Sequence, residues 1–293
     1  MEINSQTEEF VYSSQDDIDL LRAGHRCVTD GENIYLAYNE PDLYVMTVGE
    51  DTHRPVNLEN PDGMMVCQVT TDRSGNVHVL AADKDYKSWY IWQLNSEYGV
   101  EKIIDISSYF DTKIIPVWFL VDQKGNYFFQ LPYNRNGVIL DSAGNLLYST
   151  SPESLGLSWI YEAGVGRDGN INLVYSTDSG QMEIGVLDTQ TGAFQKGDMG
   201  LSMQEGETFQ AMYAGTDTDL LLYSPYSGIW AYDRTTSVFE NRVPLPEMGF
   251  DPGREYFPMT FLKDGRLLLI GCPLNSGDVD TNGCILRYVP AGK

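Results

Sequence analysis

Near the C-terminus, Asp278, Asp280 and Asn282 alternate with other residues and precede Gly283. Oxygen ligands at alternate positions before a glycine turn suit a hard cation such as Ca²⁺. An EF-hand loop also needs a glutamate at its twelfth position, and Val289 stands there, so an EF-hand is excluded. Two alternatives remain, a structural Ca²⁺ in a non-EF loop or an Asn-Gly hairpin turn without metal, and the hairpin is favoured. We expect no other cofactor.

Catalytic chemistry has little support in the sequence. General acid-base catalysis relies most often on histidine, and the chain has three: His25, His53 and His78. The last two lie in predicted strands, and the first has no obvious acid, base or nucleophile beside it. Spacing alone does not single out a carboxylate pair among 42 acidic residues. We therefore assign no catalytic residue and favour a protein that is not an enzyme.

One unit recurs six times along the chain: an apolar strand, a turn rich in Asp, Gly and Asn, and a second apolar strand. Its copies are TDGENIYLAY, TDRSGNVHVLAA, VDQKGNYFFQLP, GRDGNINLVYS, GTDTDLLLYS and LKDGRLLLIG. The spacing of about 44 to 50 residues is too long for ankyrin or leucine-rich repeats and is typical of a four-stranded propeller blade. The turn residues allow the positive φ that a tight reversal needs.

The predicted fold is all-β, a six-bladed β-propeller of four-stranded blades in a single domain spanning 1–293. The third unit shows four strands, at 116–121, 126–131, 138–140 and 145–150, whereas the sixth supplies only three. Segment 9–14 (EFVYSS) has no hairpin partner beside it, so we predict that it closes the ring as the outermost strand of the last blade. The predicted blades are approximately 22–60, 61–108, 109–154, 155–202, 203–248 and 249–293.

The DxxGN turn before an aliphatic strand, as at 72–76 and 122–126, resembles that of NHL and TolB-like propellers. By analogy of fold, such rings act as binding platforms, lyases, lactonases or docking modules, so function depends on the site. Tracts such as FLVDQKGNYFFQLP are also similar to propeller regions of exported Gram-positive solute-binding lipoproteins. That resemblance implies a position outside the cytoplasm.

Aromatic and arginine side chains gather in the loops that a propeller presents on its binding face. Aromatic rings there can stack on sugars or anchor a peptide or partner domain, and a guanidinium can hold a carboxylate. The alternatives are packing between blades for the aromatics and surface ion pairs for the arginines. The candidate ligand-binding residues are Tyr86, Trp118, Tyr133, Arg135, Trp159, Tyr226, Arg254 and Tyr256.

The charge balance restricts the partners. The chain has 19 basic and 42 acidic residues, a net charge of -23, which disfavours nucleic acid and anionic membrane surfaces. No apolar run is long enough to insert into a membrane. We expect a secreted or cell-surface protein whose signal segment is absent from this chain.

Four cysteines, Cys27, Cys67, Cys272 and Cys284, lack the close spacing of a zinc site. They are expected to be buried thiols, with a disulfide between Cys272 and Cys284, on neighbouring strands of one hairpin, as the alternative.

Together these features predict a non-catalytic extracytoplasmic module. It would recognise a carbohydrate, peptide or partner domain through its aromatic-rich face. The alternative is a propeller hydrolase or lyase with a calcium-assisted site, and a third hypothesis is a spacer that positions a neighbouring domain.

Overall fold

The repeated turns are organised by an aspartate that accepts hydrogen bonds from residues further along the turn. Asp72 Oδ1 accepts from the backbone N–H groups of Ser74 (2.8 Å) and Asn76 (2.9 Å). Its Oδ2 accepts from the side-chain amide of Asn76 at 2.8 Å. Gly75 between them has a φ of 89°, which a residue without Cβ adopts at no steric cost. The same pairing joins Asp122 to Asn126 and Asp141 to Asn145, and this explains the DxxGN pattern.

These turns connect antiparallel strands into six sheets. The computed structural model describes residues 8–11, 27–50, 53–60, 63–110, 115–131, 136–166, 168–197, 208–214, 219–275, 278–279 and 284–291. Blade 1 contains β2 (Cys27–Thr29), β3 (Asn33–Ala37), β4 (Leu43–Thr47) and β5 (Arg54–Val56). Blade 2 contains β6 (Met65–Thr71), β7 (Val77–Ala82), β8 (Trp89–Leu94) and β9 (Val100–Asp105). Blade 3 contains β10 (Trp118–Val121), β11 (Tyr127–Gln130), β12 (Gly137–Leu140) and β13 (Leu146–Thr150).

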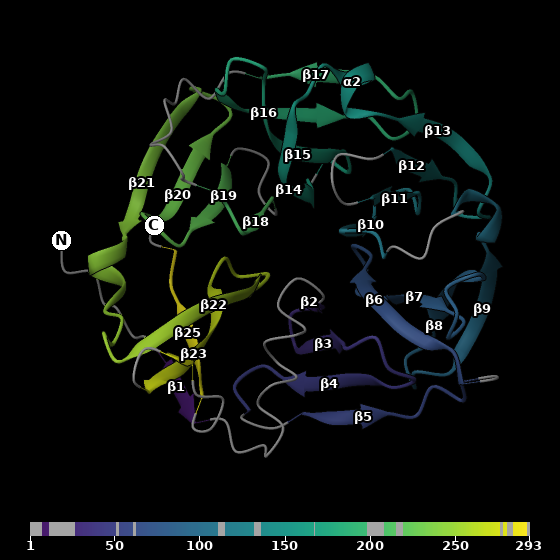
Figure 1. Cartoon of the computed structure of the whole chain (residues 1–293), viewed down its shortest axis with the longest axis horizontal. Helices are drawn as coiled ribbons and strands as arrows, with labels where there is room; N and C mark the ends of the chain where they lie inside the picture. Colours follow the sequence, from purple (N-terminus) through teal and green to yellow (C-terminus); the bar gives the residue numbers. More distant parts are fainter. Residues whose placement is uncertain are drawn as a thin grey trace.

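The second half of the chain repeats the arrangement. Blade 4 contains β14 (Trp159–Val165), β15 (Ile171–Ser176), β16 (Met182–Leu187) and β17 (Phe194–Lys196). Blade 5 contains β18 (Ala211–Tyr213), β19 (Asp219–Ser224), β20 (Gly228–Asp233) and β21 (Val238–Pro244). Blade 6 contains β22 (Arg254–Phe261), β23 (Leu267–Asn275), β25 (Ile285–Val289) and β1 (Glu8–Val11), with the short β24 (Asp278–Val279) paired to β23. Figure 1 shows the six sheets around a central axis, so the predicted six-bladed propeller is confirmed.

The ring is closed by the N-terminal strand, as predicted. β1 lies antiparallel to β25, from Glu8 opposite Tyr288 to Val11 opposite Ile285. In Figure 1 the purple β1 lies beside the yellow strands of the last blade. Of the predicted segment 9–14, residues 12–14 lie outside the described part of the chain. Closure pairs the outer edge of β25, so both ends of the described chain are held in one sheet.

The core consists of six apolar clusters, one at each contact between neighbouring blades. Strand β3 shows how alternation supplies two of them. Ile34 and Leu36 pack against blade 6, whereas Tyr35 and Ala37 pack against blade 2. Both faces of each blade are therefore buried, and this is why the inner strands are continuously apolar.

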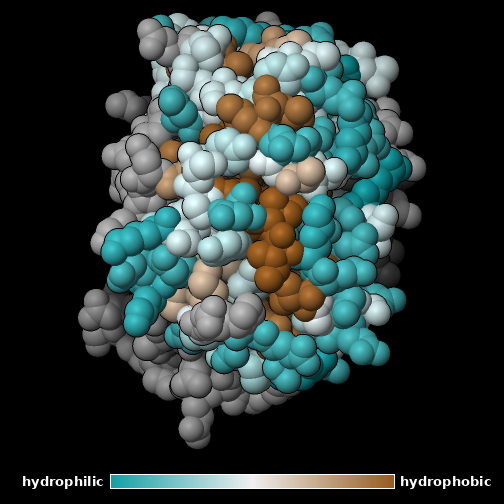
Figure 2. All heavy atoms as spheres, turned by 90° about the vertical axis from the view of Figure 1, so that its right-hand side faces the viewer, coloured by the Kyte–Doolittle hydropathy of each residue, from teal (hydrophilic) through white to brown (hydrophobic). Residues whose placement is uncertain are grey.

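Apolar side chains are also exposed on the outer rim, away from the central axis. Ile103 on β9 and Leu146 and Leu147 on β13 are exposed. Figure 2, which views the side of the ring where these outer strands lie, shows apolar atoms surrounded by hydrophilic ones. These residues offer control positions for experiments on the channel.

Cys272 and Cys284 form a disulfide across blade 6, with their Cα atoms 4.3 Å apart. The expectation that all four cysteines are thiols is therefore wrong for this pair, and the alternative is correct. Cys272 lies in β23 and Cys284 immediately precedes β25. Because these strands are neighbours, the two side chains meet across the sheet.

The helical elements that lie wholly within the described residues are α2 (Pro152–Leu155) and the 3₁₀ turns η2 (Ser107–Tyr109) and η3 (Leu245–Met248). Each is too short to cross a bilayer, and the described part of the chain has no other helix that does.

Replacing Asp141 with alanine is expected to lower the free energy of unfolding by about 1–2 kcal/mol, because the turn loses the acceptor for three donors. These donors are Ala143 N, Asn145 N and Asn145 Nδ2, at 2.8, 2.8 and 2.9 Å. Urea unfolding measures the change. Ser142→Ala in the same turn is the control, and equal effects of the two variants would contradict the role of the aspartate.

Replacing both Cys272 and Cys284 with serine is expected to lower the free energy of unfolding by about 2–3 kcal/mol, because the disulfide closes a loop of 12 residues that would otherwise be unconstrained in the unfolded chain. Thermal melts with and without reductant test this. Reductant should lower the melting temperature of the wild type and leave the double variant unchanged. A wild type that is insensitive to reductant would show that the bond is absent.

Candidate functional site

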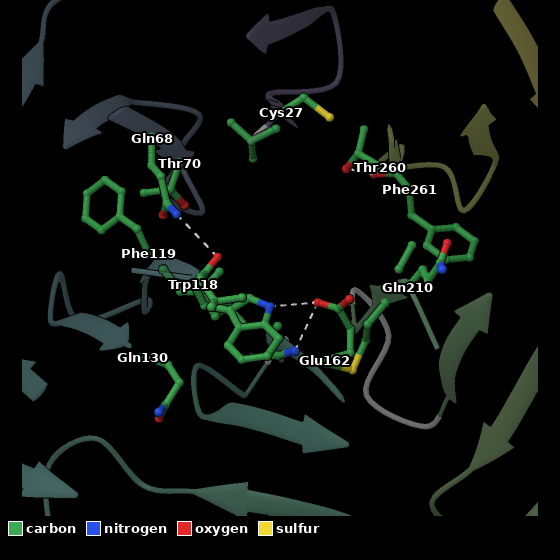
Figure 3. Close-up of a pocket in the computed structure, with 18 of the residues that line it drawn as sticks. Cys27, Gln68, Thr70, Trp118, Phe119, Gln130, Glu162, Gln210, Thr260 and Phe261 are labelled. Carbon is green, nitrogen blue, oxygen red and sulfur yellow. Dashed lines mark hydrogen bonds between the residues drawn. The ribbon is translucent and has the colours of Figure 1, made fainter. Parts of the chain in front are cut away.

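A channel of about 830 Å³ runs through the centre of the ring. This volume is in the range of ligand-binding pockets. All six blades contribute to its lining, through residues that include Cys27, Gln68, Trp118, Glu162, Gln210 and Thr260, and Figure 3 shows these side chains around the opening. We call the end at which the inner strands begin the upper face and the opposite end the lower face.

Bulges in three inner strands determine which side chains reach the channel. The register shifts between Val66 and Gln68 in β6, between Ile160 and Glu162 in β14, and between Pro258 and Thr260 in β22. A bulge re-aims the side chains that follow it. Gln68, Glu162 and Thr260 each follow the shift and line the channel. Each of the three bulges is thus followed by a polar side chain that lines the channel.

Glu162 is the acidic residue among the described residues that line the channel. Its Oε1 accepts a hydrogen bond from Trp118 Nε1 at 2.9 Å and another from Ala163 N at 3.1 Å. Both bonds end on the same oxygen. Within the described residues Oε2 accepts no hydrogen bond, and no Lys or Arg forms an ion pair with this carboxyl. The second oxygen is thus available to a ligand.

Burial raises the pKa of Glu162 to about 7, and the hydrogen bonds from Trp118 and Ala163 oppose the rise. Burial acts in this direction because the channel wall solvates the charged carboxylate less well than water does. The side chain keeps some accessible surface toward the channel, so it can exchange its proton with solvent. A carboxyl with this pKa changes charge near neutral pH.

Amide side chains from three blades also line the channel, those of Gln68, Gln130 and Gln210. Gln68 Nε2 donates to the carbonyl oxygen of Pro116 and, at 3.3 Å, to that of Val117. These bonds attach β6 to the segment before β10. The Gln210 side chain makes no hydrogen bond to the described residues, and it lines the channel, near Phe261 in the view of Figure 3. Its donor and acceptor can therefore both serve a ligand.

Two groups with catalytic potential, the Cys27 thiol and the His78 imidazole, have shifted pKa values. Burial raises the pKa of the Cys27 thiol to about 12, and its Sγ donates to the Met259 carbonyl at 2.8 Å. It stays protonated and is a poor nucleophile. Burial also lowers the pKa of His78, against the opposing effect of Asp72. His78 contacts Tyr127 between blades 2 and 3 and is not among the residues that line the channel.

Two of the predicted binding residues line the channel, Trp118 and Trp159. Both are the first residue of an inner strand, so they lie at the upper face. Trp159 is 45% exposed, whereas the Trp118 indole is tied to Glu162. The Trp118 indole is thus joined to the Glu162 carboxyl across blades 3 and 4, while Trp159 lies three residues before Glu162 at the start of β14.

Other predicted residues lie on the same face but outside the channel lining. Tyr86 is at the tip of the β7–β8 hairpin, where its hydroxyl accepts a hydrogen bond from Asn39 and its ring packs on Trp89. Tyr226 lies in the β19–β20 turn and is 65% exposed. The structure therefore does not join these two side chains to the tryptophans at the channel.

Arg254 and Tyr256 lie in β22 rather than in the blade-linking loop expected for them. Arg254 donates to the Gly271 carbonyl at 3.0 Å and lies 3.8 Å from an Asp251 oxygen. Tyr256 stacks on Phe250 with ring centroids 4.1 Å apart. The pairing of β22 with β23 extends to Arg254 and so draws both residues into packing within blade 6.

The remaining predicted residues lie wholly or partly outside the described part of the chain. Tyr133, Arg135, Asp280 and Asn282 lie outside the described residues, and Asp278 is described only through the backbone pairing of β24 with β23. In the described ranges, no group of three or more His, Cys, Asp or Glu side chains is placed to hold a metal ion. The calcium hypothesis for 278–283 stays a prediction.

Glu162, Gln68 and Gln210 were missed by the sequence analysis because they lie in or beside inner strands rather than in loops. A signal for Glu162 was present. The segment WIYEAGV places one charged residue inside an otherwise apolar strand of a closed ring, and a buried charge requires a partner or a function.

No protein-family model matches the chain, and no curated protein is significantly similar to it. Solved structures do share its fold. A catalytically inactive virginiamycin B lyase from Staphylococcus aureus with quinupristin aligns with a TM-score of 0.53 at 13% identity, covering 90% of this chain and 79% of that one. A chain of the mitotic checkpoint complex gives 0.53 at 10% identity, covering 98% and 94%. YCF48 bound to D1 peptide gives 0.50 at 11% identity, covering 88% and 76%. These likenesses establish the propeller fold.

Replacing Glu162 with glutamine is expected to stabilise the protein more at pH 8 than at pH 5. Between its ordinary pKa of 4.5 and the raised value of about 7, the folded chain keeps a proton that the unfolded chain has lost. Stability from this group is therefore lost as the pH rises through the folded pKa, by at most about 3 kcal/mol. Glutamine does not titrate, so the free energy of unfolding of the variant lacks this dependence on pH.

Urea unfolding of both proteins at the two pH values measures this difference. Glu101→Gln, on an exposed position of β9, is the control and should change the pH dependence little. An identical pH dependence for the wild type and Glu162→Gln would show that the carboxyl titrates normally.

Proposed function

We propose that this chain is a non-catalytic binding module that accepts a peptide segment of a partner protein at the upper mouth of its channel. The observation that carries the proposal is the combination along the channel of two indoles, the Gln210 amide, which makes no hydrogen bond to the described residues, and a carboxylate with an available oxygen. Indoles supply apolar contact area and hot-spot residues. The amide and carboxylate groups supply directional hydrogen bonds.

A peptide fits this lining better than a sugar does. The carboxamide of Gln210 offers one donor pair and one acceptor, the complement of a peptide group. Structural neighbours of similar fold have been solved with a peptide, as YCF48 was, and within a protein assembly. At this low sequence identity, these neighbours support peptide binding as a use of the fold, but they do not identify the ligand of this chain. If the test below detects carbohydrate binding instead, a carbohydrate replaces the peptide as the proposed ligand.

The disulfide supports a location outside the cytoplasm. Disulfides persist in oxidising compartments and are rare in the reducing cytosol, and Cys272 is joined to Cys284 here. The high negative charge adds solubility in an exposed setting. We therefore propose that the module belongs to a cell-surface or secreted protein.

A peptide array and a glycan array probed with the purified chain test the proposal. We expect peptide hits with micromolar or tighter affinity, and Trp159→Ala should weaken their binding about tenfold, because this exposed indole is a hot-spot type of residue. Leu146→Ala, exposed on the outer rim, is the matched control and should leave the affinity unchanged.

Two results would reject the proposal. Hits on the glycan array alone would make the channel a carbohydrate site. Peptide hits that survive Trp159→Ala but weaken with Leu146→Ala would place the site on the outer rim.

A further inference from the structure

The acidic and the basic side chain of the channel lie at different depths. Of the described residues that line it, Glu162 and Lys263 carry formal charges. Lys263 follows β22 and packs at the lower face, where its side chain lies against the turns at Gly31 and Gly75. Glu162 is the fourth of the seven residues of β14, four residues before the lower turn at Gly166, so it is the acidic group that a ligand entering from the upper face meets before Lys263.

The geometry of Glu162 leaves one acceptor directed to a ligand. Trp118 and Ala163 both donate to Oε1, which fixes the orientation of the carboxyl group while Oε2 accepts no bond from the described residues. Figure 3 shows the carboxyl at the edge of the opening, beside the Trp118 indole and across from Thr260. A carboxylate held in one orientation with a vacant oxygen is suited to a charge-assisted bond from N⁺–H.

The neighbouring groups favour a cation over a neutral donor. An indole face attracts a cation within about 6 Å of its ring. Trp118 contacts Glu162, and Trp159 also lines the channel. The net charge of -23 also attracts cationic ligands over a distance. Long basic side chains have apolar stems that match the apolar wall between these groups.

From these observations, and resting on the proposed function, we propose that the channel recognises a basic side chain of the bound peptide, an arginine or lysine, whose cationic group donates to Glu162 Oε2 beside the Trp118 indole. The specificity of the module is then for peptides that carry such a residue at an exposed position.

Capped tripeptides test this independently of the arrays. The probes are Gly-Arg-Gly and Gly-Lys-Gly, with Gly-citrulline-Gly and Gly-norleucine-Gly as neutral partners of the same length. The reporter is the indole N–H signal of Trp118 in protein labelled with ¹⁵N-tryptophan, assigned by its loss in Trp118→Phe. We expect the two basic probes to shift this signal saturably and to bind at least tenfold more tightly than their neutral partners.

The variant Glu162→Gln keeps an oxygen acceptor for Trp118 and Ala163 but removes the charge. It should reduce the affinity for the basic probes to that for the neutral ones, while Glu101→Gln leaves the preference intact. Equal binding of basic and neutral probes to the wild type would overturn the inference, as would the absence of any shift with the basic probes. These comparisons on the wild type hold even if a variant fails to fold.

The two proposals fail in different ways. Array hits without a basic residue, which still depend on Trp159, would retain the peptide-binding function and reject the cation preference. Basic probes that bind at Glu162 while no array peptide binds would retain the cation site and reject the peptide module.

Discussion

The architecture depends on the burial of both faces of every blade. A single four-stranded sheet here is apolar on each side, so it is stable only between two neighbours, and six such contacts close on themselves as a ring. The pairing of β1 with β25 completes the sixth blade. Closure leaves a central space that the short inner strands do not fill, and their side chains become the lining of the channel.

The same constraint explains how well the fold could be predicted. The repeat is visible because each blade needs the same turn, and the Asp–Asn hydrogen bonds at Asp72 and Asp122 explain the recurring letters. The closing strand could be predicted because the sixth unit had one strand too few. The strand limits in blade 3 differ from the predicted ones by no more than a few residues, since alternation and turn residues bound each strand.

The candidate site was less predictable because it depends on bulges. A period of two residues assigns each side chain of a strand to one face, but the shift between Ile160 and Glu162 interrupts that alternation. No residue type in WIYEAGV specifies such a shift. Trp118 and Trp159 could be found because large aromatics at the start of inner strands reach the upper face. Nothing in the sequence distinguished Arg254 and Tyr256 from these two tryptophans. Only the extended pairing of β22 with β23 shows that Arg254 and Tyr256 belong to a strand of blade 6.

The channel combines an oriented carboxyl, the Trp118 indole that donates to it and the Gln210 amide, which makes no hydrogen bond to the described residues. The most direct measurement is the pKa of Glu162, followed by the ¹³C shift of its side-chain carboxyl in labelled protein with and without an arginine tripeptide. The account predicts titration near pH 7 in the free protein and a fall in the pKa when the cationic peptide is bound. Titration near 4.5 that the peptide does not change would contradict it.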